Sequence, residues 1–238
     1  MARFEHDAAS VAAEPVRRRP GRPSADEAGL SASAILDAAL KAFATHGYEG
    51  VSVRTLNRDL GVSNSLLSQR FGSKDDLWHA AIDHGFGTIS RHMSDVFDPT
   101  ITDPLEQLAL WIRRFLLFSA QHPELVALMN IEGRQDTPRL DYIYDTYVHP
   151  SMGRVGSLLE HLASTGRIRP TPLRAFALLV AHGGAGLFTL VPLAEHFDPA
   201  SPLSPDAVEA HAELITELVI AGLQVPPPVP KPKRRSSS

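Results

Sequence analysis

The sequence predicts an all-α protein, and three observations support this fold class. Between residues 31 and 224, nearly every segment carries apolar residues three and four positions apart, which is the period of an amphipathic helix. Strictly alternating runs of β-branched residues, which are typical of strands, are missing. Serines that favour helix N-termini precede the first four apolar segments, at Ser31, Ser52, Ser63 and Ser73.

The composition is that of a globular protein of one large or two modest domains. The 238 residues are 43% hydrophobic and 21% charged, and they include no cysteine. The lack of cysteine excludes disulfide scaffolds, thiolate zinc sites, iron–sulfur clusters and cysteine nucleophiles. The first ten residues contain acids and no apolar run, so they are not a secretory signal. We therefore expect a cytoplasmic protein.

The charge is distributed unevenly along the chain. The whole sequence has a net charge of −4, but residues 15–74 hold nine Lys or Arg against five Asp or Glu. This segment is therefore net +4 and the rest is net −8. A basic front on an acidic body indicates that the N-terminal part meets a polyanion.

The first two helices are predicted from their caps and stops. The first begins at the cap Ser31 and ends at Gly47, with one apolar face made by Ile35, Leu36, Ala39, Leu40 and Phe43. The second begins at the cap Ser52, passes through Leu56 to Leu60, and ends at Gly61.

The next two helices complete the N-terminal unit. The third is expected from a cap at Ser63 through Leu67 to Phe71. Because Gly61-Val62-Ser63 makes a tight turn between two short helices, this pair forms a helix-turn-helix. Ser73 and Asp76 form a capping pair that starts the fourth helix, whose buried face comprises Leu77, Trp78, Ala81 and Ile82.

Residues 35–84 resemble the DNA-binding domain of TetR/AcrR-type transcriptional regulators. The pieces that carry the resemblance are ILDAAL, HGY, the GVS turn and FGSKDDL, in this order. The resemblance implies an all-α homodimer in which a three-helix DNA-binding domain is linked by the fourth helix to a C-terminal domain that binds a small effector. The expected parts are residues 31–85 for DNA binding and 86–224 for effector binding and dimerisation.

The chain departs from the commonest family pattern at three positions. Ser68 stands where Tyr is usual and Arg70 where His is usual, so an aromatic phosphate contact is replaced by a cation. Asn57 stands where a small Ala is usual in the second helix, so its amide has to find a partner or reach the surface.

The third helix is expected to read base edges in the major groove. If Val62, Leu67 and Phe71 face inward, the outward side chains are those of Asn64, Ser65, Ser68 and Gln69. Leu66 belongs either to the core or to a contact with a thymine methyl. The alternative for the whole group is a merely solvated polar face.

Four further residues are candidates for phosphate contacts. Ser52 and Thr55 open the second helix, where hydroxyls and backbone N–H groups suit phosphate oxygens, although they are equally compatible with capping alone. Lys74 resembles the family's backbone-contacting lysine. Arg70 either contacts phosphate or pairs with Asp75 or Asp76.

Both ends of the chain are predicted to be disordered. Residues 1–30 form a basic arm whose Gly-Arg-Pro segment resembles an AT-hook, so Arg19 and Arg22, with Arg17 and Arg18, are expected at the minor groove. The alternative is that these arginines only aid solubility. Residues 225–238 form a Pro-rich basic tail that we interpret as solvated.

Aromatic stripes in the C-terminal part are candidates for an effector pocket. Trp111, Phe115 and Phe118 lie on one helical face. Such stripes are more often core, but the resemblance implies a pocket, so the expected lining is Trp111, Phe115, Met129, Tyr147 and His182. Tyr hydroxyls and His182 would supply its few polar anchors. His122, Pro123 and Glu124 indicate a helix break and restart rather than a site.

The last two helices, about 172–191 and 205–223, are the expected dimer interface. The small residues of 181–186 let helices approach closely, with packing inside the chain against the fourth helix as the alternative. Residues 175–194 lack charges, but the glycines and Pro192 within them favour a buried helix over a membrane span.

The sequence predicts that the protein is not an enzyme, because it contains no GxSxG, HExxH, P-loop or dinucleotide motif. No cofactor is implied, and the histidine spacing indicates no metal site. The expected partners are double-stranded DNA, a second copy of the chain and a small apolar effector, but no membrane. The expected function is a repressor released from a pseudo-palindromic operator by that effector, and the alternative is a DNA-binding regulator or architectural protein without an effector.

Overall fold

The computed structural model describes residues 30–97 and 100–225, and these residues are helical with no strand among them. The only bridge of extended backbone within these ranges joins Ile168 to Gln224. The all-α prediction is therefore confirmed. The predicted arm, with Arg17, Arg18, Arg19 and Arg22, lies outside the described residues, as does nearly all of the predicted C-terminal tail.

The N-terminal unit is formed by α1 (Ala32–Gly50), α2 (Val53–Asp59), α3 (Leu66–Phe71) and the first half of α4 (Lys74–Ser94). Ser31 caps α1, its hydroxyl accepting from the Ala34 N–H at 3.0 Å. The helix breaks where predicted, because Gly47 takes φ +68°, a left-handed conformation that favours glycine. Ser73 and Asp76 form a complete capping box that starts α4.

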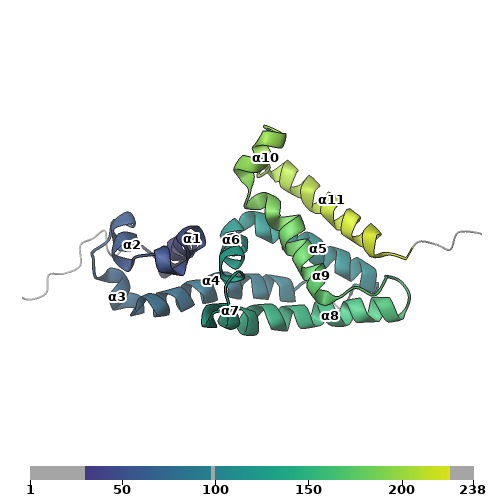
Figure 1. Ribbon diagram of the computed structural model, residues 1–238, viewed down its shortest axis with the longest axis horizontal. Coiled ribbons are helices and arrows are strands. Elements are labelled where there is room, and N and C mark those ends of the chain that lie inside the picture. The colour runs from purple at the N-terminus through teal and green to yellow at the C-terminus, as the bar shows by residue number, and fades with distance from the viewer. Residues whose placement is uncertain (1–29, 98–99, 226–238) are drawn as a thin grey trace, which may run out of the picture.

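The remaining helices build the body of the molecule (Figure 1). They are α5 (Pro104–Gln121), α6 (Pro123–Glu132), α7 (Pro138–Ile143), α8 (His149–Ser164), α9 (Leu173–Leu178), α10 (Val191–Phe197) and α11 (Pro205–Leu223). The π-helical segment η1 (Tyr144–Val148) joins α7 to α8, and the π-helical η2 (Leu179–Gly184) with the 3₁₀ segment η3 (Ala185–Phe188) follows α9. The break and restart predicted at 122–124 is confirmed by α5 and α6.

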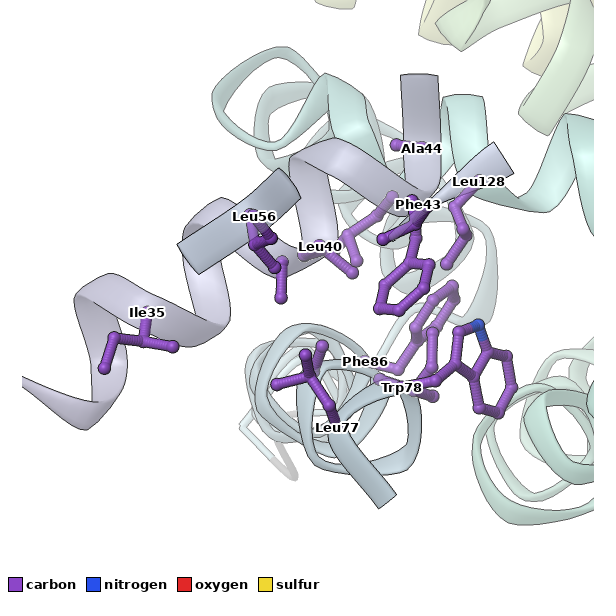
Figure 2. Packing of buried hydrophobic residues seen from close by; sticks show 14 of the residues in the cluster. Ile35, Leu40, Phe43, Ala44, Leu56, Leu77, Trp78, Phe86 and Leu128 are labelled. Carbon is purple, nitrogen blue, oxygen red and sulfur yellow. The ribbon is translucent and has the colours of Figure 1, made fainter. Parts of the chain in front are cut away.

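Helix α4 connects the two parts. In Figure 1 it runs from the three-helix unit, at the left, into the body. Its first half contributes Leu77, Trp78 and Ile82 to a core shared with α1, and Phe86 lies in the same cluster (Figure 2). Leu125 and Leu128 of α6 pack into this cluster as well. The N-terminal unit and the body therefore share a hydrophobic core.

A second core lies in the body. It comprises buried side chains of α4, α5, α8, α9 and α11, among them Met93, Trp111, Leu116, Leu159 and Phe176. Two ion pairs lie at the edge of this core: Arg113 with Glu209, and Arg167 with Asp103. The Arg167 guanidinium, which donates to both carboxylate oxygens, holds the pKa of Asp103 below its usual value.

The segment predicted as one helix over 172–191 is irregular, and this prediction was wrong in detail. Residues 173–188 pass from α-helix to π-helix to 3₁₀ helix. The expectation of a buried helix holds for one face only, since Phe176 and Val180 are buried whereas Leu178 and Leu179 are exposed. Within the described residues no single helix is long and apolar enough to span a membrane, but 173–188 and 191–197, bent by 77°, meet that criterion of length and composition together.

Candidate functional site: a DNA-reading surface joined to an apolar cavity

The turn between α2 and α3 is held by Asn57. This side chain is fully buried, and its Oδ1 accepts from the Leu67 N–H at 3.2 Å while its Nδ2 donates to the Asn64 carbonyl at 3.1 Å. The amide thus satisfies one N–H of the first turn of α3 and one carbonyl of the turn before it. Asn57, whose amide was predicted to need a hydrogen-bond partner or to reach the surface, therefore has two partners.

The bond from Leu67 to Asn57 corrects the predicted start of the third helix. Helix α3 begins at Leu66, three residues after the expected cap Ser63, and Ser65 at its N-cap makes no capping bond with its side chain. Because Asn57 accepts from the Leu67 N–H, the helix needs no hydroxyl cap of its own. Residues 63–65 instead form a turn, in which the Leu66 N–H bonds to the Ser63 carbonyl.

The predicted base-reading residues lie on the solvent side of this unit. Leu67 is buried and Val62, Leu66 and Phe71 are half-buried, whereas all four candidates are exposed: Asn64, Ser65, Ser68 and Gln69. Gln69 Nε2 donates to Ser65 Oγ at 3.0 Å, which orders one amide on this surface.

The predicted phosphate contacts flank this surface. Ser52 caps α2 through a long bond from the Thr55 N–H, and both residues are exposed. Arg70 donates to the Leu30 carbonyl at 3.2 Å and pairs with neither Asp75 nor Asp76. Arg54, in the first turn of α2, is an exposed cation with no ion pair among the described residues, and the sequence analysis missed it.

Lys74 is tied to the body through an aromatic ring. Its Nζ lies 4.4 Å from the ring centroid of Tyr48, and the Arg139 guanidinium lies 4.2 Å from the same centroid. Arg139 also pairs with the buried Glu132 at 3.3 Å. Burial, followed by the charge of Asp75, raises the pKa of Tyr48. This cluster joins α1 and the start of α4 to α6 and α7.

A cavity of about 490 Å³ lies inside the body. This volume falls within the roughly 300–1,000 Å³ typical of small-molecule sites. The lining is largely apolar and includes all five residues predicted for it: Trp111, Phe115, Met129, Tyr147 and His182. His182 is exposed and so lies at the rim.

The cavity also has polar lining that the sequence analysis missed, namely Ser90, Ser119, His122, Asn130, Arg134 and Ser151. His122 was interpreted only as part of a helix break, and this was incomplete because its ring faces the cavity after the break. Its Nδ1 lies 3.2 Å from the Glu124 carboxylate, which holds the ring in position.

Helix α4 forms one wall of the cavity through Phe86, Ile89, Ser90 and Met93. The same helix begins at Lys74, directly after α3 and its exposed polar side chains. A ligand in the cavity would therefore touch the element that positions α3.

Asp83 of α4 is bonded to the cavity wall. Its Oδ1 accepts from the Tyr142 hydroxyl at 2.6 Å and from the Tyr147 hydroxyl at 2.7 Å, and only Tyr147 of the two lines the cavity. Burial and these bonds raise the pKa of Tyr142 to about 12 and raise that of Tyr147 further. Both phenols therefore remain neutral donors at physiological pH.

Within the small-residue run of 181–186, Gly184 packs inside its own chain. A Cβ on Gly184 would lie 2.8 Å from Leu116 and 3.2 Å from Ile215, and the Gly184 carbonyl accepts from His211 Nε2 at 2.7 Å. Its neighbours are thus α5 and α11, and not the fourth helix, which was the expected alternative inside the chain. Exposed apolar side chains occur in the neighbouring stretches of the sequence: Leu179, Leu190, Leu193, Phe197, Leu214 and Leu218.

Comparison with known proteins gives two partial sequence matches, and structural matches over most of the chain. Over 101 residues the chain is 28% identical to the HTH-type transcriptional repressor SCO4008 of Streptomyces coelicolor, and over 55 residues it is 40% identical to the HTH-type transcriptional repressor AcnR of Corynebacterium glutamicum. These matches cover 42% and 23% of this chain, but only 48% and 29% of the two relatives.

The fold is shared with solved structures over most of the chain. A bacterial regulatory protein of the tetR family from Rhodococcus RHA1 superposes with a TM-score of 0.63 at 20% identity, covering 82% of this chain and 98% of that one. Residues 35–81, which build α1 to α3 and the start of α4, match the sequence model of the bacterial regulatory proteins of the tetR family. The N-terminal segment of the chain is therefore of the type found in the bacterial regulatory proteins of the tetR family.

Proposed function

We propose that the protein is a DNA-binding transcriptional regulator, most simply a repressor, whose affinity for DNA is changed by a small apolar molecule in the cavity. One observation carries the proposal: α4 runs from Lys74, beside the exposed face of α3, to Phe86, Ile89 and Met93 in the cavity wall. A single rigid helix that serves both sites supplies the coupling that such a response requires.

The bonds of Asp83 support a route for the response. A ligand that displaces the Tyr147 ring would break one of the two hydrogen bonds that anchor α4 to the body. The helix would then shift, and with it the position of α3. The ligand lowers DNA affinity only if it binds the shifted arrangement better than the DNA-bound one.

We further propose that the protein acts as a homodimer on a pseudo-palindrome. In a two-fold dimer the two α3 helices would lie about one DNA turn apart, roughly 34 to 36 Å, and would read two half-sites. Leu214 and Leu218, which are exposed four residues apart on one face of α11, support this association, because an exposed apolar face can mark a protein contact site.

The DNA-binding part is tested by selecting bound sequences from a random DNA pool with the full chain, and then measuring affinities for the selected site. Gln69→Ala and Asn64→Ala should each weaken specific binding by about 1–3 kcal/mol while leaving binding to random DNA nearly unchanged. Gln121→Ala, at an exposed position at the end of α5, serves as the control. Equal losses of affinity for the selected site and for random DNA would show that these two residues do not read bases. If the selection enriches no sequence, the proposal of a transcriptional regulator is refuted.

The cavity favours a ligand-responsive regulator over one without an effector. The two are separated by gel shifts on the selected site with and without a molecule that enters the cavity. An unchanged DNA affinity at saturating ligand would leave the DNA-binding function standing and remove the response.

A further inference from the structure

The chain enters the N-terminal unit beside the last turn of α3. Arg70, in that turn, donates from its guanidinium to the Leu30 carbonyl at 3.2 Å, and the Leu30 side chain packs against the core of this unit. Leu30 is the first residue that the structure describes, and α1 begins two residues later. The segment before residue 30 therefore starts at the end of the helix that carries the proposed base-reading side chains.

This segment carries a concentrated positive charge. Residues 15–24, which we call the basic segment, contain no acid and four arginines: Arg17, Arg18, Arg19 and Arg22. The basic segment is therefore net +4, since the acids Asp26 and Glu27 lie after it. Such a charge is attracted to DNA phosphates, and arginine is favoured in a narrow minor groove because the negative potential is enhanced there.

The spacing along the chain matches the distance to a minor groove. Arg22 precedes Leu30 by eight residues. An extended chain spans at most about 3.3–3.6 Å per residue, so the two Cα atoms lie up to about 26–29 Å apart. If α3 lies in a major groove, the nearest minor grooves are about half a DNA turn away, roughly 17 Å. The flanking minor groove is therefore within the span of this connection.

The described part of the reading unit has little free positive charge of its own. Of the three arginines in α2 and α3, Arg58 pairs with Asp59 and Arg70 is bonded to Leu30. Arg54 is thus the one arginine of these two helices without a partner in the described part of the chain. The basic segment would add positive charge where this unit lacks it.

We propose that the basic segment binds in the minor groove that flanks each half-site and favours A·T base pairs there. An arginine side chain only donates hydrogen bonds, and A·T pairs present only acceptors in the minor groove, whereas a G·C pair adds the donor amino group of guanine N2. This role rests on the proposed DNA-binding function, but it concerns base pairs outside the site that α3 would read.

Three forms of the selected DNA site identify the groove. They differ only in the flanks, about half a DNA turn on each side, which consist of A·T, G·C or I·C pairs. Inosine lacks the N2 amino group of guanine but presents the same groups in the major groove. The full-length protein should bind the A·T and I·C forms about three- to tenfold more tightly than the G·C form. Reading in the major groove would instead make I·C equivalent to G·C.

Two charge-matched variants of the full chain assign the preference to the basic segment. The first combines four substitutions in this segment: Arg17→Ala, Arg18→Ala, Arg19→Ala and Arg22→Ala. It should bind all three forms equally, and its plot of log affinity against log salt should become shallower by about two to four units of slope. The control removes the same charge at the other end of the chain and should keep the preference: Lys231→Ala, Lys233→Ala, Arg234→Ala and Arg235→Ala. Both variants should still distinguish the selected site from random DNA, because α3 is unchanged.

Equal affinity of the wild-type protein for the three forms would overturn the proposal, as would binding of I·C flanks that matches G·C flanks. Survival of the preference in the first variant would overturn it too, because other residues would then read the flanks. None of these results affects the reading of the central site by α3. If the selection enriches no sequence, the regulator is refuted separately, and uniform A·T, G·C and I·C duplexes still test the basic segment with the same two variants.

Discussion

Single side chains carry the connections on which the proposed response depends. Asn57 joins α2 to α3 through two buried hydrogen bonds, and Asp83 joins α4 to Tyr142 and Tyr147. In each case one polar group satisfies two partners, so removing it leaves two groups without a bond. Substitutions at these positions should have effects out of proportion to their size.

Asn57→Ala should lower the free energy of unfolding by about 1–3 kcal/mol, because the Leu67 N–H and the Asn64 carbonyl lose their partner. It should also weaken DNA binding, since the turn before α3 is no longer held. Urea unfolding and gel shifts measure the two effects. Ser63→Ala is the control and should stay within about 0.5 kcal/mol of wild type. A larger loss of unfolding free energy for Ser63→Ala would show that Ser63 caps α3, as predicted from the sequence.

The raised pKa of Tyr142 and Tyr147 predicts a loss of stability in alkali. A phenol whose pKa is higher in the folded than in the unfolded protein stabilises the fold fully below the unfolded value of 10.0. This contribution is lost as the pH rises from 10 through about 12, because the unfolded chain ionises first.

Thermal melts between pH 8 and pH 11.5 test this expectation. Asp83→Asn removes the carboxylate that accepts from both phenols, so its melting temperature should fall less steeply than that of wild type above pH 10. Parallel curves for the two proteins would show that Asp83 does not govern the alkaline transition.

The sequence predicts the lining of the cavity better than its polar groups. The five predicted lining residues follow from aromatic and apolar stripes together with the family resemblance, and all five face one space. His122 could not be found in this way, because a His beside Pro also marks a helix end.

At the scale of helices, α4 packs closely against α1 and α6 at Gly85. A Cβ at Gly85 would lie 2.7 Å from Leu125 and 2.8 Å from Leu40, and both leucines are buried in the shared core. The missing side chain therefore lets α4 approach α1 and α6 closely.

Gly85→Ala and Gly153→Ala form a matched pair of helix-interior substitutions. A Cβ at Gly153, in α8, meets nothing within 4 Å, so the alanine there should gain up to about 1 kcal/mol from helix propensity. At Gly85 the same gain is opposed by overpacking, and the two variants should differ by about 1–3 kcal/mol in unfolding free energy. Calorimetric melts of equal stability would show that the leucines yield without cost.

Helix starts with a hydroxyl cap were predicted to the residue, as Ser31, Ser52 and Ser73 show. The start of α3 was not, because its first turn is satisfied by a side chain from another helix. The π and 3₁₀ segments after α9 were also missed. They differ from α-helix in hydrogen-bond register, and apolar spacing does not resolve that difference over six residues.

At the scale of the whole molecule, the proposed dimer contact lies on the exposed face of α11, one of the two helices predicted for the interface, and not on the small-residue run. Leu214 and Leu218 of α11 are 52% and 59% exposed, and they lie four residues apart on one helical face. By contrast, Gly184 is buried against α5 and α11 of its own chain. Substituting Gly184 should therefore damage the fold of each subunit before it affects association.

The double substitution Leu214→Glu with Leu218→Glu should give a monomer at low micromolar concentration, because it places four charges in a two-fold interface. Light scattering measures the mass, and circular dichroism verifies that the helices persist. Tyr144→Glu, an exposed apolar position in η1, is the control and should remain dimeric. A folded double variant with the mass of a dimer would place the interface on another face.

The fold class and the order of the helices follow from the sequence because caps, stops and apolar faces are local signals. The sharing of a core between α1, α4 and α6 does not, since it depends on which faces meet. The predicted boundary after residue 85 thus falls inside a helix whose Phe86 still belongs to the N-terminal cluster.

The shape of the cavity depends on the number of residues in the two π-helical segments, because both segments line it. Both η1 and η2 contribute lining, including Tyr147, Val180 and His182, and a π turn holds more residues than an α turn. Deleting one residue from η1 would allow regular α-helix to run from α7 to α8, and the side chains of this segment would then lie in a different register against the cavity. The contour of the site is thus set by chain length as well as by side-chain identity, so relatives that differ by a single-residue insertion or deletion would enclose differently shaped spaces.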